Sequence, residues 1–142
     1  MSEDPHRLQR FVDAQDEAGT YERALAELRA VRKTGHWIWL VFPQIAGLGS
    51  SPTARTYGID SLAEARAYLE HPVLGPRLLE CSRVLAELDA GSADEVLGDV
   101  DALKLRSSMT LFARAVPEEP IFRRVLEKYF GGRTDEATEQ RL

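Results

Sequence analysis

The stretch His36–Tyr57 reads HWIWLVFPQIAGLGSSPTARTY, and the rest of the chain is organised around it. It opens with a run of large apolar residues from Trp37 to Phe42, which stops at Pro43. A loop rich in glycine and hydroxyl residues follows. Bulky apolar residues beside a polar loop are the usual composition of a small-molecule site, with a packed wall and a flexible rim. The stretch therefore predicts a ligand pocket without identifying the ligand.

The apolar run from His36 to Phe42 is compatible with a strand or a helix. Its aromatic and β-branched residues are typical of a buried strand. The chain holds no second stretch of comparable strand character, and a lone strand leaves its backbone groups without partners. We therefore expect a short buried helix here.

Helical periodicity and capping signals fill the remainder of the chain. Asp4-Pro5 predicts the start of a first helix. Thr20 predicts the start of a second helix, which is expected to end at Gly35 and to place Glu27 on its outward face. Further helices are predicted from Pro52 onward and over residues 61–71, 78–90, 92–98, 99–115 and 121–130. The expected fold is all-α: a compact single domain over residues 1–142, with about seven to nine short helices and a frayed tail at 136–142.

Composition excludes several classes of function. The chain has 142 residues, 44% of them apolar, and a net charge of −5 without basic clusters, so no nucleic-acid partner is expected. The single cysteine, Cys81, excludes an internal disulfide and a thiolate-rich metal site. No signal segment is visible, and no apolar run approaches the roughly 20 residues that span a bilayer. We expect a cytoplasmic protein with no membrane partner; its oligomeric state is not indicated.

The glycine-rich loop is the first candidate for chemistry. Gly47 and Gly49 let backbone N–H groups approach an anion, and Ser50 and Ser51 add hydroxyl donors. The loop is not a phosphate-binding P-loop, because no lysine follows its last glycine. An ordinary glycine turn followed by a serine cap remains the alternative.

His36 and the two tryptophans flank this loop. His36 is a candidate acid or base, or a cation placed at the C-terminus of the preceding helix. Trp37 and Trp39 cannot share one face of a helix, so at least one of them is expected to pack in the core. The other is then available to stack on a flat ligand.

A second polar segment lies in the predicted helix 99–115. Asp101, Lys104 and Ser108 fall one helical turn apart on a common face, with Ser107 beside them. A surface ion pair of little energetic weight is the alternative explanation. Because apolar residues suggest that this helix is buried on several sides, its polar groups need partners, which a bound polar ligand would supply.

Other chemistries receive little support. His6, His36 and His71 are widely separated and form no spaced metal-binding pair, so no metal or cofactor is predicted. Cys81 lies among leucines and is expected to be an inert small apolar residue.

A family resemblance runs through the same residues. It is carried by HWIW (36–39), FPQ (42–44), GLG (47–49), Ser51, YGI (57–59), Asp101, KL (104–105), SSMTLF (107–112) and YF (129–130). From Leu8 to Asp135 the chain resembles the bacterial domain-of-unknown-function family 1810. The resemblance implies a compact, mostly helical domain and no particular activity. Members are sometimes labelled calpastatin, yet the chain lacks the repetitive, disordered character of a calpain inhibitor.

The order of segments is also distantly similar to the NADAR superfamily, which is associated with ADP-ribose and riboflavin-related glycosidic chemistry. That superfamily's glutamate–histidine pair has no counterpart here, because residues 53–57 contain neither amino acid. This departure argues against the same catalysis.

Two hypotheses follow. The first is a pocket for a phosphorylated or nucleotide/ADP-ribose-like ligand. If the chain hydrolyses an N-glycosidic bond, Asp101 would stabilise positive charge on the sugar and His36 would transfer protons. The residues expected to bind the ligand are Trp37, Trp39, Gln44, Gly47, Gly49, Ser50, Ser51, Tyr57, Lys104, Ser107 and Ser108. The second hypothesis is a non-catalytic interaction or dimerisation module that uses the apolar run and the helix 121–130.

Overall fold

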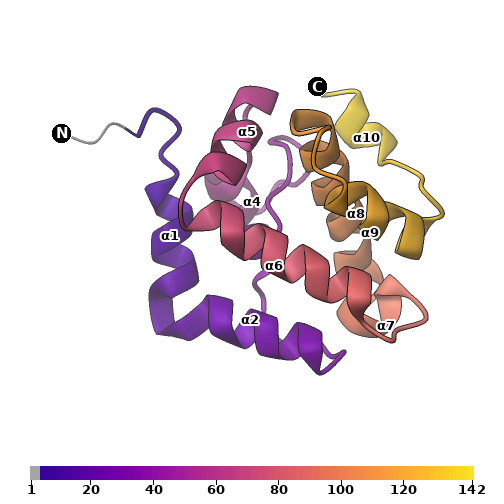
Figure 1. The fold of residues 1–142 in the computed structure, drawn as a ribbon. Helices are drawn as coiled ribbons and strands as arrows, with labels where there is room; N and C mark the ends of the chain where they lie inside the picture. Colours follow the sequence, from indigo (N-terminus) through magenta and orange to yellow (C-terminus); the bar gives the residue numbers. More distant parts are fainter. Residues whose placement is uncertain (1–3) are drawn as a thin grey trace.

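The computed structural model describes residues 4–142, and its regular elements are helices (Figure 1). In chain order they are α1 (Gln9–Asp16), the 3₁₀ turn η1 (Glu17–Gly19), α2 (Thr20–Arg29), α3 (Ile38–Val41), α4 (Pro52–Tyr57), α5 (Leu62–Glu70), α6 (Leu74–Glu87), α7 (Ala93–Leu97), α8 (Asp99–Ala115), α9 (Ile121–Phe130) and α10 (Glu136–Glu139). Of the α-helices in this part of the chain, α3 and α10 are single turns and the other eight are longer. The predicted all-α fold is confirmed.

Helix α8 is the centre of the molecule. It contacts α3, α5, α7, α9 and α10, and α6 lies across α5 and α9 (Figure 1). From Leu105 onward it is buried on several sides, as the sequence predicted, and even Ser107, Ser108 and Thr110 are buried, whereas Val100 and Leu103 near its start are exposed. Polar groups on this helix therefore lie close to the core, where they need partners.

Four aromatic rings join the first helix to the last long one. Phe11 of α1 packs edge-on against Tyr68 of α5 with ring centroids 5.1 Å apart. Tyr68 contacts Phe112 of α8 at 5.5 Å, and Phe112 contacts Phe122 of α9 at 5.6 Å. All four side chains are fully buried, so this chain of rings forms the middle of the core.

The apolar run folds as predicted. Residues Ile38–Val41 form the short helix α3, which is buried except for the partly exposed Leu40, and it ends at Phe42, just before Pro43. After α3, Ile45 and Ile59 form an isolated parallel bridge. The N–H of Ala46 donates to the carbonyl of Ile59 at 2.7 Å, and the N–H of Ile59 donates to Gln44 at 2.8 Å. The sequence did not predict this bridge, which closes the loop 46–58 at its base.

The predicted ends of the first two helices are wrong. Helix α1 begins at Gln9 instead of at Asp4-Pro5, and the Asp4 carboxylate reaches forward to accept the N–H groups of Leu8 and Gln9. Helix α2 ends at Arg29 instead of continuing to Gly35, and the chain reverses at Val31 with a positive φ of 56°.

The cause of this early ending is Glu27, which was predicted to face outward. Its carboxylate accepts the N–H groups of Thr34 and Gly35 at 2.7 and 2.9 Å, and the indole N–H of Trp37 at 2.9 Å. Burial raises the pKa of Glu27, but these donors outweigh burial and lower it to about 2. A tertiary interaction of one side chain thus overrides the helical pattern of the sequence.

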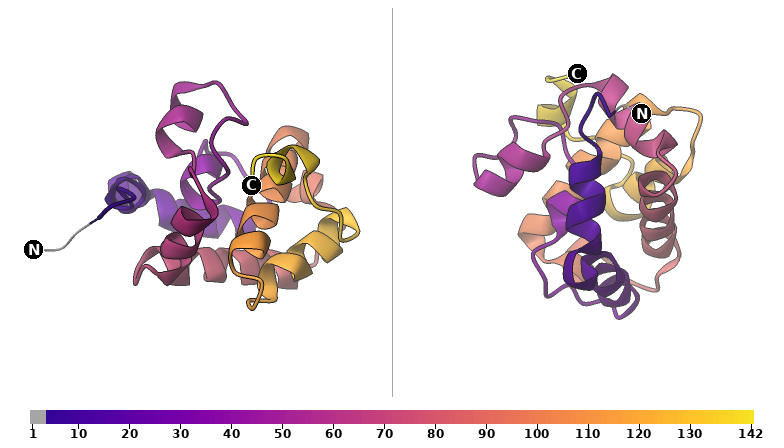
Figure 2. Two further views of the ribbon diagram at one scale, coloured as in Figure 1. Left: turned by 90° about the horizontal axis from the view of Figure 1, so that it is seen from above. Right: turned by 90° about the vertical axis from the view of Figure 1, so that its left-hand side faces the viewer.

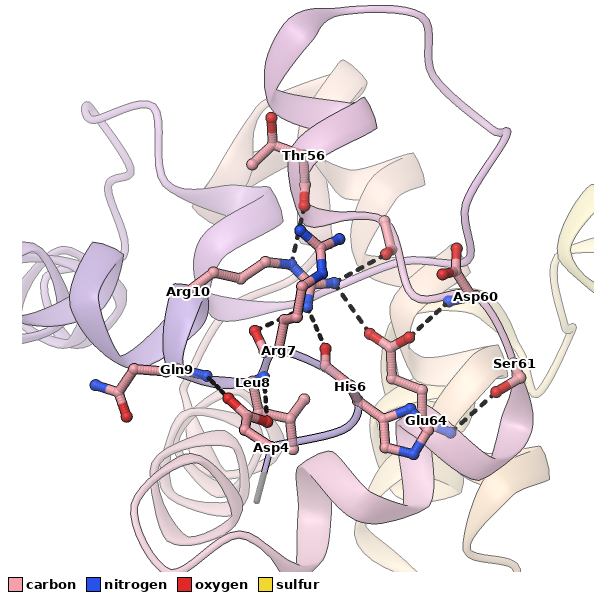
Figure 3. Close-up of polar contacts among 11 residues, drawn as sticks. Asp4, His6, Arg7, Leu8, Gln9, Arg10, Thr56, Asp60, Ser61 and Glu64 are labelled. Carbon is pink, nitrogen blue, oxygen red and sulfur yellow. Dashed lines mark hydrogen bonds and ion pairs between the residues drawn. The ribbon is translucent and has the colours of Figure 1, made fainter. Parts of the chain in front are cut away.

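The N-terminal turn is held by Arg10. Its guanidinium donates to the carbonyls of Thr56 and Gly58 at 2.9 and 3.2 Å, and pairs with Glu64 of α5 at 3.0 Å (Figure 3). It also donates to the carbonyl of His6. Arg10 therefore connects the start of the chain to the end of α4 and the start of α5.

The tail is folded where we expected fraying. Residues Glu136–Glu139 form α10, which is capped by Asp135 and packs on α8, and Thr138 is fully buried. None of the helices in residues 4–142 combines the length and the apolar character needed to cross a bilayer.

Candidate functional site

The two polar segments predicted from the sequence meet in one hollow of about 460 Å³, which we call the α3–α8 cleft. Its walls come from α3, the loop after it, α8 and the C-terminal segment. It is lined by Trp39, Gln44, Leu48, Gly49, Ser50, Ser51, Ala54, Leu103, Lys104, Ser107, Asp135 and Ala137. The hollow is within the size range of small-molecule sites.

The loop wall is built on Trp39. A Cβ added to Gly49 would lie 3.2 Å from the indole ring and 2.9 Å from Ala54, so only glycine allows this close approach. Ser51 accepts the N–H of Ala54 at 3.1 Å, which caps α4 and leaves its hydroxyl hydrogen free to donate. Beyond this wall, α4 and its flanking loop project from the body of the molecule (Figure 2).

Gln44 lies in this wall with only 2% of its surface exposed. Its backbone carbonyl accepts the N–H of Ile59 in the isolated bridge, which fixes the backbone. Its side-chain Nε2 has no hydrogen-bond partner among the described residues. A buried donor without a partner costs about 1–3 kcal/mol. Gln44, a residue of the cleft lining, therefore holds a buried amide donor without a partner.

The α8 wall carries positive charge. Asp101 pairs with Lys33 at 2.7 Å through one carboxylate oxygen and with Lys104 at 3.4 Å through the other. The Lys33 side chain is 6% exposed and that of Lys104 is 35% exposed. Two ammonium groups against one carboxylate leave one net positive charge, and Lys104 presents it to the cleft.

A smaller hollow of about 190 Å³ lies beside the cleft and shares Trp39, Ser51 and Lys104 with it. The exposed His36 and the pair Lys33–Asp101 line this smaller hollow. Both catalytic candidates are therefore next to the cleft, although neither lines it.

Two residues of the site were missed by the sequence reasoning. Lys33 donates to the carbonyl of Gly35, and its ammonium lies 4.9 Å from the centre of the Trp37 ring. Asp135 accepts the hydroxyl of Ser107 at 3.0 Å and lines the opposite end of the cleft. Both come from segments expected to be a helix end and a tail, and the only available signal was the aspartate's capping position before the last helical turn.

Four of the eleven predicted ligand-binding residues do not line the cleft. Trp37 is buried and bonded to Glu27, and Ser108 is fully buried with no partner for its hydroxyl. Tyr57 packs against Phe11 with ring centroids 5.6 Å apart. Gly47 has a positive φ of 95° and lies against the Arg141 guanidinium in the C-terminal segment. The seven remaining ligand-binding predictions all lie in the cleft.

Cys81 is fully buried in α6. Burial raises the pKa of its thiol to about 12. Because the thiolate is the reactive form, this cysteine is a packing residue and no nucleophile.

Comparisons with known proteins agree on the relationship. A family model described as "Protein of unknown function (DUF1810)" matches residues 5–142. The chain is also similar to the conserved hypothetical protein Rv1873 from Mycobacterium tuberculosis, whose crystal structure is known, with 53% sequence identity. The match covers 98% of this chain and 98% of that one, with a TM-score of 0.94. No curated protein matches the chain. The more distant NADAR likeness stays a prediction.

Proposed function

The chain belongs to the DUF1810 family of proteins of unknown function, so we propose its function from the chemistry of the α3–α8 cleft. We propose that this cleft binds a small phosphate-bearing ligand. The observation that carries this proposal is the buried amide of Gln44: the residue lines the cleft, and its Nε2 has no partner among the described residues. An acceptor on a ligand would remove the cost of leaving that donor unpaired.

The charge at the Lys104 end of the cleft favours an anion. Lys104 supplies the net positive charge of the group formed with Asp101 and Lys33. The hydroxyl hydrogen of Ser51 and the exposed Ser50 lie in the facing wall. A phosphate offers several strong acceptor oxygens to such donors, and Trp39 provides an apolar surface for the remainder of the ligand.

Hydrolysis of an N-glycosidic bond is a narrower form of this proposal. Both carboxylate oxygens of Asp101 are paired with lysines, which suits a residue that positions Lys104. In that role it stabilises the ligand-binding ammonium; a direct role opposite a sugar cation would require the lysines to move. A turnover assay with ribosyl phosphates, comparing the protein with Asp101→Asn, tests this form separately from binding.

The interaction-module alternative has less support from the same geometry. Its apolar run is buried in the core, and the apolar residues of α9 (Ile121, Phe122, Val125 and Leu126) are buried as well. The large apolar side chains exposed on α8 are Val100 and Leu103, and Leu103 already lines the cleft.

The test is calorimetric titration of the protein with organic phosphates. We expect Lys104→Ala to weaken binding roughly 10- to 100-fold, since a hydrogen bond to a charged group contributes about 1.5–3 kcal/mol. Arg124→Ala, which removes an exposed cation from α9, is the matched control and should leave affinity unchanged. Equal weakening by both variants would point to nonspecific charge attraction and contradict the proposal.

A further inference from the structure

The end of the cleft formed by Asp135 has a fixed carboxylate. Its Oδ2 accepts the hydroxyl of Ser107 at 3.0 Å, the N–H of Thr138 at 3.0 Å and the hydroxyl of Thr138 at 2.6 Å. No described residue donates to its other oxygen, and Asp135 forms no ion pair within residues 4–142. The orientation of this side chain is therefore set, while Oδ1 keeps its capacity to accept a hydrogen bond.

The anionic and cationic ends of the cleft are separated along α8. Ser107, which holds Asp135, follows Lys104 by three residues, a rise of about 4.5 Å along a helix. Lys104 leans toward Asp101, in the opposite direction from Ser107. A ligand that places phosphate at Lys104 thus extends its next few atoms toward Asp135.

The chemistry of that next group is restricted by Asp135 and Gln44 together. The Oδ1 of Asp135 can accept a hydrogen bond, and the buried Nε2 of Gln44 lacks an acceptor. A hydroxyl group satisfies both, because it donates one hydrogen and accepts another. An ammonium group cannot accept, and a second phosphate would be repelled by the carboxylate.

We infer, on the basis of the function proposed above, that Asp135 and Gln44 recognise a ligand hydroxyl, and that the ligand is a phosphorylated polyol of the sugar phosphate class. Lys104 binds its phosphate, and Trp39 packs against its carbon chain. The specificity of the cleft therefore comes from a residue of the C-terminal segment as well as from Gln44 in the facing wall.

Three compounds with the same anion test this assignment by calorimetry: ribitol 5-phosphate, pentyl phosphate and 5-aminopentyl phosphate. Their phosphate and carbon chain are matched, and they differ in carrying hydroxyls, no polar group or an ammonium. We expect ribitol 5-phosphate to bind at least tenfold more tightly than pentyl phosphate. Asp135→Asn and Gln44→Met should each bring that ratio close to one.

Both variants are designed to keep the fold. Asparagine caps helices as well as aspartate does, so Asp135→Asn preserves the start of α10. Methionine fills the volume of Gln44 without the unpaired donor. Their thermal unfolding temperatures check this before binding is compared.

The outcomes distinguish a failure of the hydroxyl assignment from a failure of the proposed phosphate-binding function. If ribitol and pentyl phosphates bind equally and both are lost in Lys104→Ala, the function stands and the hydroxyl assignment is overturned. If 5-aminopentyl phosphate binds most tightly and Asp135→Asn removes its advantage, that end of the cleft recognises an ammonium and the assignment is again overturned. If none of the three binds, the proposed function is overturned and the inference falls with it.

Discussion

Gln44 shows how one side chain combines a stability cost with a binding role. The residue is buried beside a fixed backbone bridge, and its amide nitrogen has no partner in the described structure. Such a group weakens the folded state unless something else binds it. A protein with a ligand in the cleft would recover this free energy on binding.

Replacement of Gln44 by methionine should therefore raise stability while it lowers affinity. The apolar side chain has a similar shape and removes the unpaired donor, so we expect the free energy of unfolding of the ligand-free protein to rise by about 1 kcal/mol. Denaturant unfolding measures the change. A loss of stability would mean that the Gln44 amide is bonded in solution, and would remove the main argument for the cleft.

Glu27 predicts a pH dependence. Its pKa of about 2 lies below the ordinary value of 4.5, so the unfolded chain binds more protons in this window. The contribution of Glu27 is therefore complete above about pH 4.5 and is lost as the pH falls toward 2. We expect Glu27→Gln to lower the free energy of unfolding at pH 7 by about 1–3 kcal/mol, with a smaller difference near pH 2.

Urea unfolding at several pH values checks this prediction. Glu22→Gln removes an exposed carboxylate from the same helix and is the matched control, expected to change little. Parallel pH profiles for the protein and Glu27→Gln would show that Glu27 does not carry the shift.

The site was only partly predictable residue by residue. The seven predicted residues that line the cleft lie in two stretches, where glycine, hydroxyl and charged residues interrupt apolar patterns. Lys33 and Asp135 come from other segments, because tertiary contacts such as the ion pair of Lys33 and the hydrogen bond from Ser107 to Asp135 leave no periodic signal. The backbone turn at Val31, which precedes Lys33, was equally invisible, since β-branched residues rarely adopt a positive φ.

At the level of elements, the junction of α5 and α6 depends on a close approach at Gly75. A Cβ added to Gly75 would lie 2.0 Å from the carbonyl oxygen of Leu69. Because that contact is with backbone, the helices would have to move apart. We expect Gly75→Ala to destabilise the protein by at least about 1–3 kcal/mol, the range for overpacking a core.

A second glycine supplies the control. A Cβ at Gly91 would meet only the Glu95 carboxylate, at an ordinary 3.6 Å. Thermal unfolding of Gly91→Ala should match the parent protein, while Gly75→Ala should unfold at a clearly lower temperature. Similar unfolding temperatures for the two variants would contradict the close packing of α5 on α6.

Helix α3 was predicted correctly for a reason that concerns the whole chain. Its residues favour a strand locally, but no partner strand exists in the sequence, and the structure shows a buried helix. The end of α2 was predicted wrongly because the competing interaction of Glu27 joins residues of adjacent elements. The helical type of α3 could be predicted because a strand without a partner strand would leave its backbone groups without hydrogen bonds. The end of α2 could not be predicted, because it depends on the contacts of a single side chain.

For the whole molecule, Arg10 is the main connection between the N-terminal turn and the loop that bears the cleft. Its ion pair with Glu64 is largely buried, with side chains 13% and 4% exposed. Removing one member of a buried pair typically costs about 3–5 kcal/mol, because the other charge is left without compensation. We expect a loss of that size for Arg10→Met.

Arg29→Met provides the comparison, since the pair Arg29–Glu80 spans 3.9 Å between well-exposed side chains. Exposed pairs contribute roughly 0–1 kcal/mol, so this variant should unfold near the parent protein. Both losses can be measured in guanidinium unfolding curves. Equal effects of the two substitutions would show that Arg10 does not organise the N-terminal region.

The isolated bridge between Ile45 and Ile59 has a consequence for how this fold diversifies. Since two backbone hydrogen bonds join the ends of the loop 46–58, its length and composition can change without displacing the helices on either side. Doubling a flexible loop adds only about 0.6 kcal/mol of closure entropy. Changes in the length of this segment would therefore be expected to reshape the rim of the cleft while Gln44, Lys104 and Asp135 stay in place.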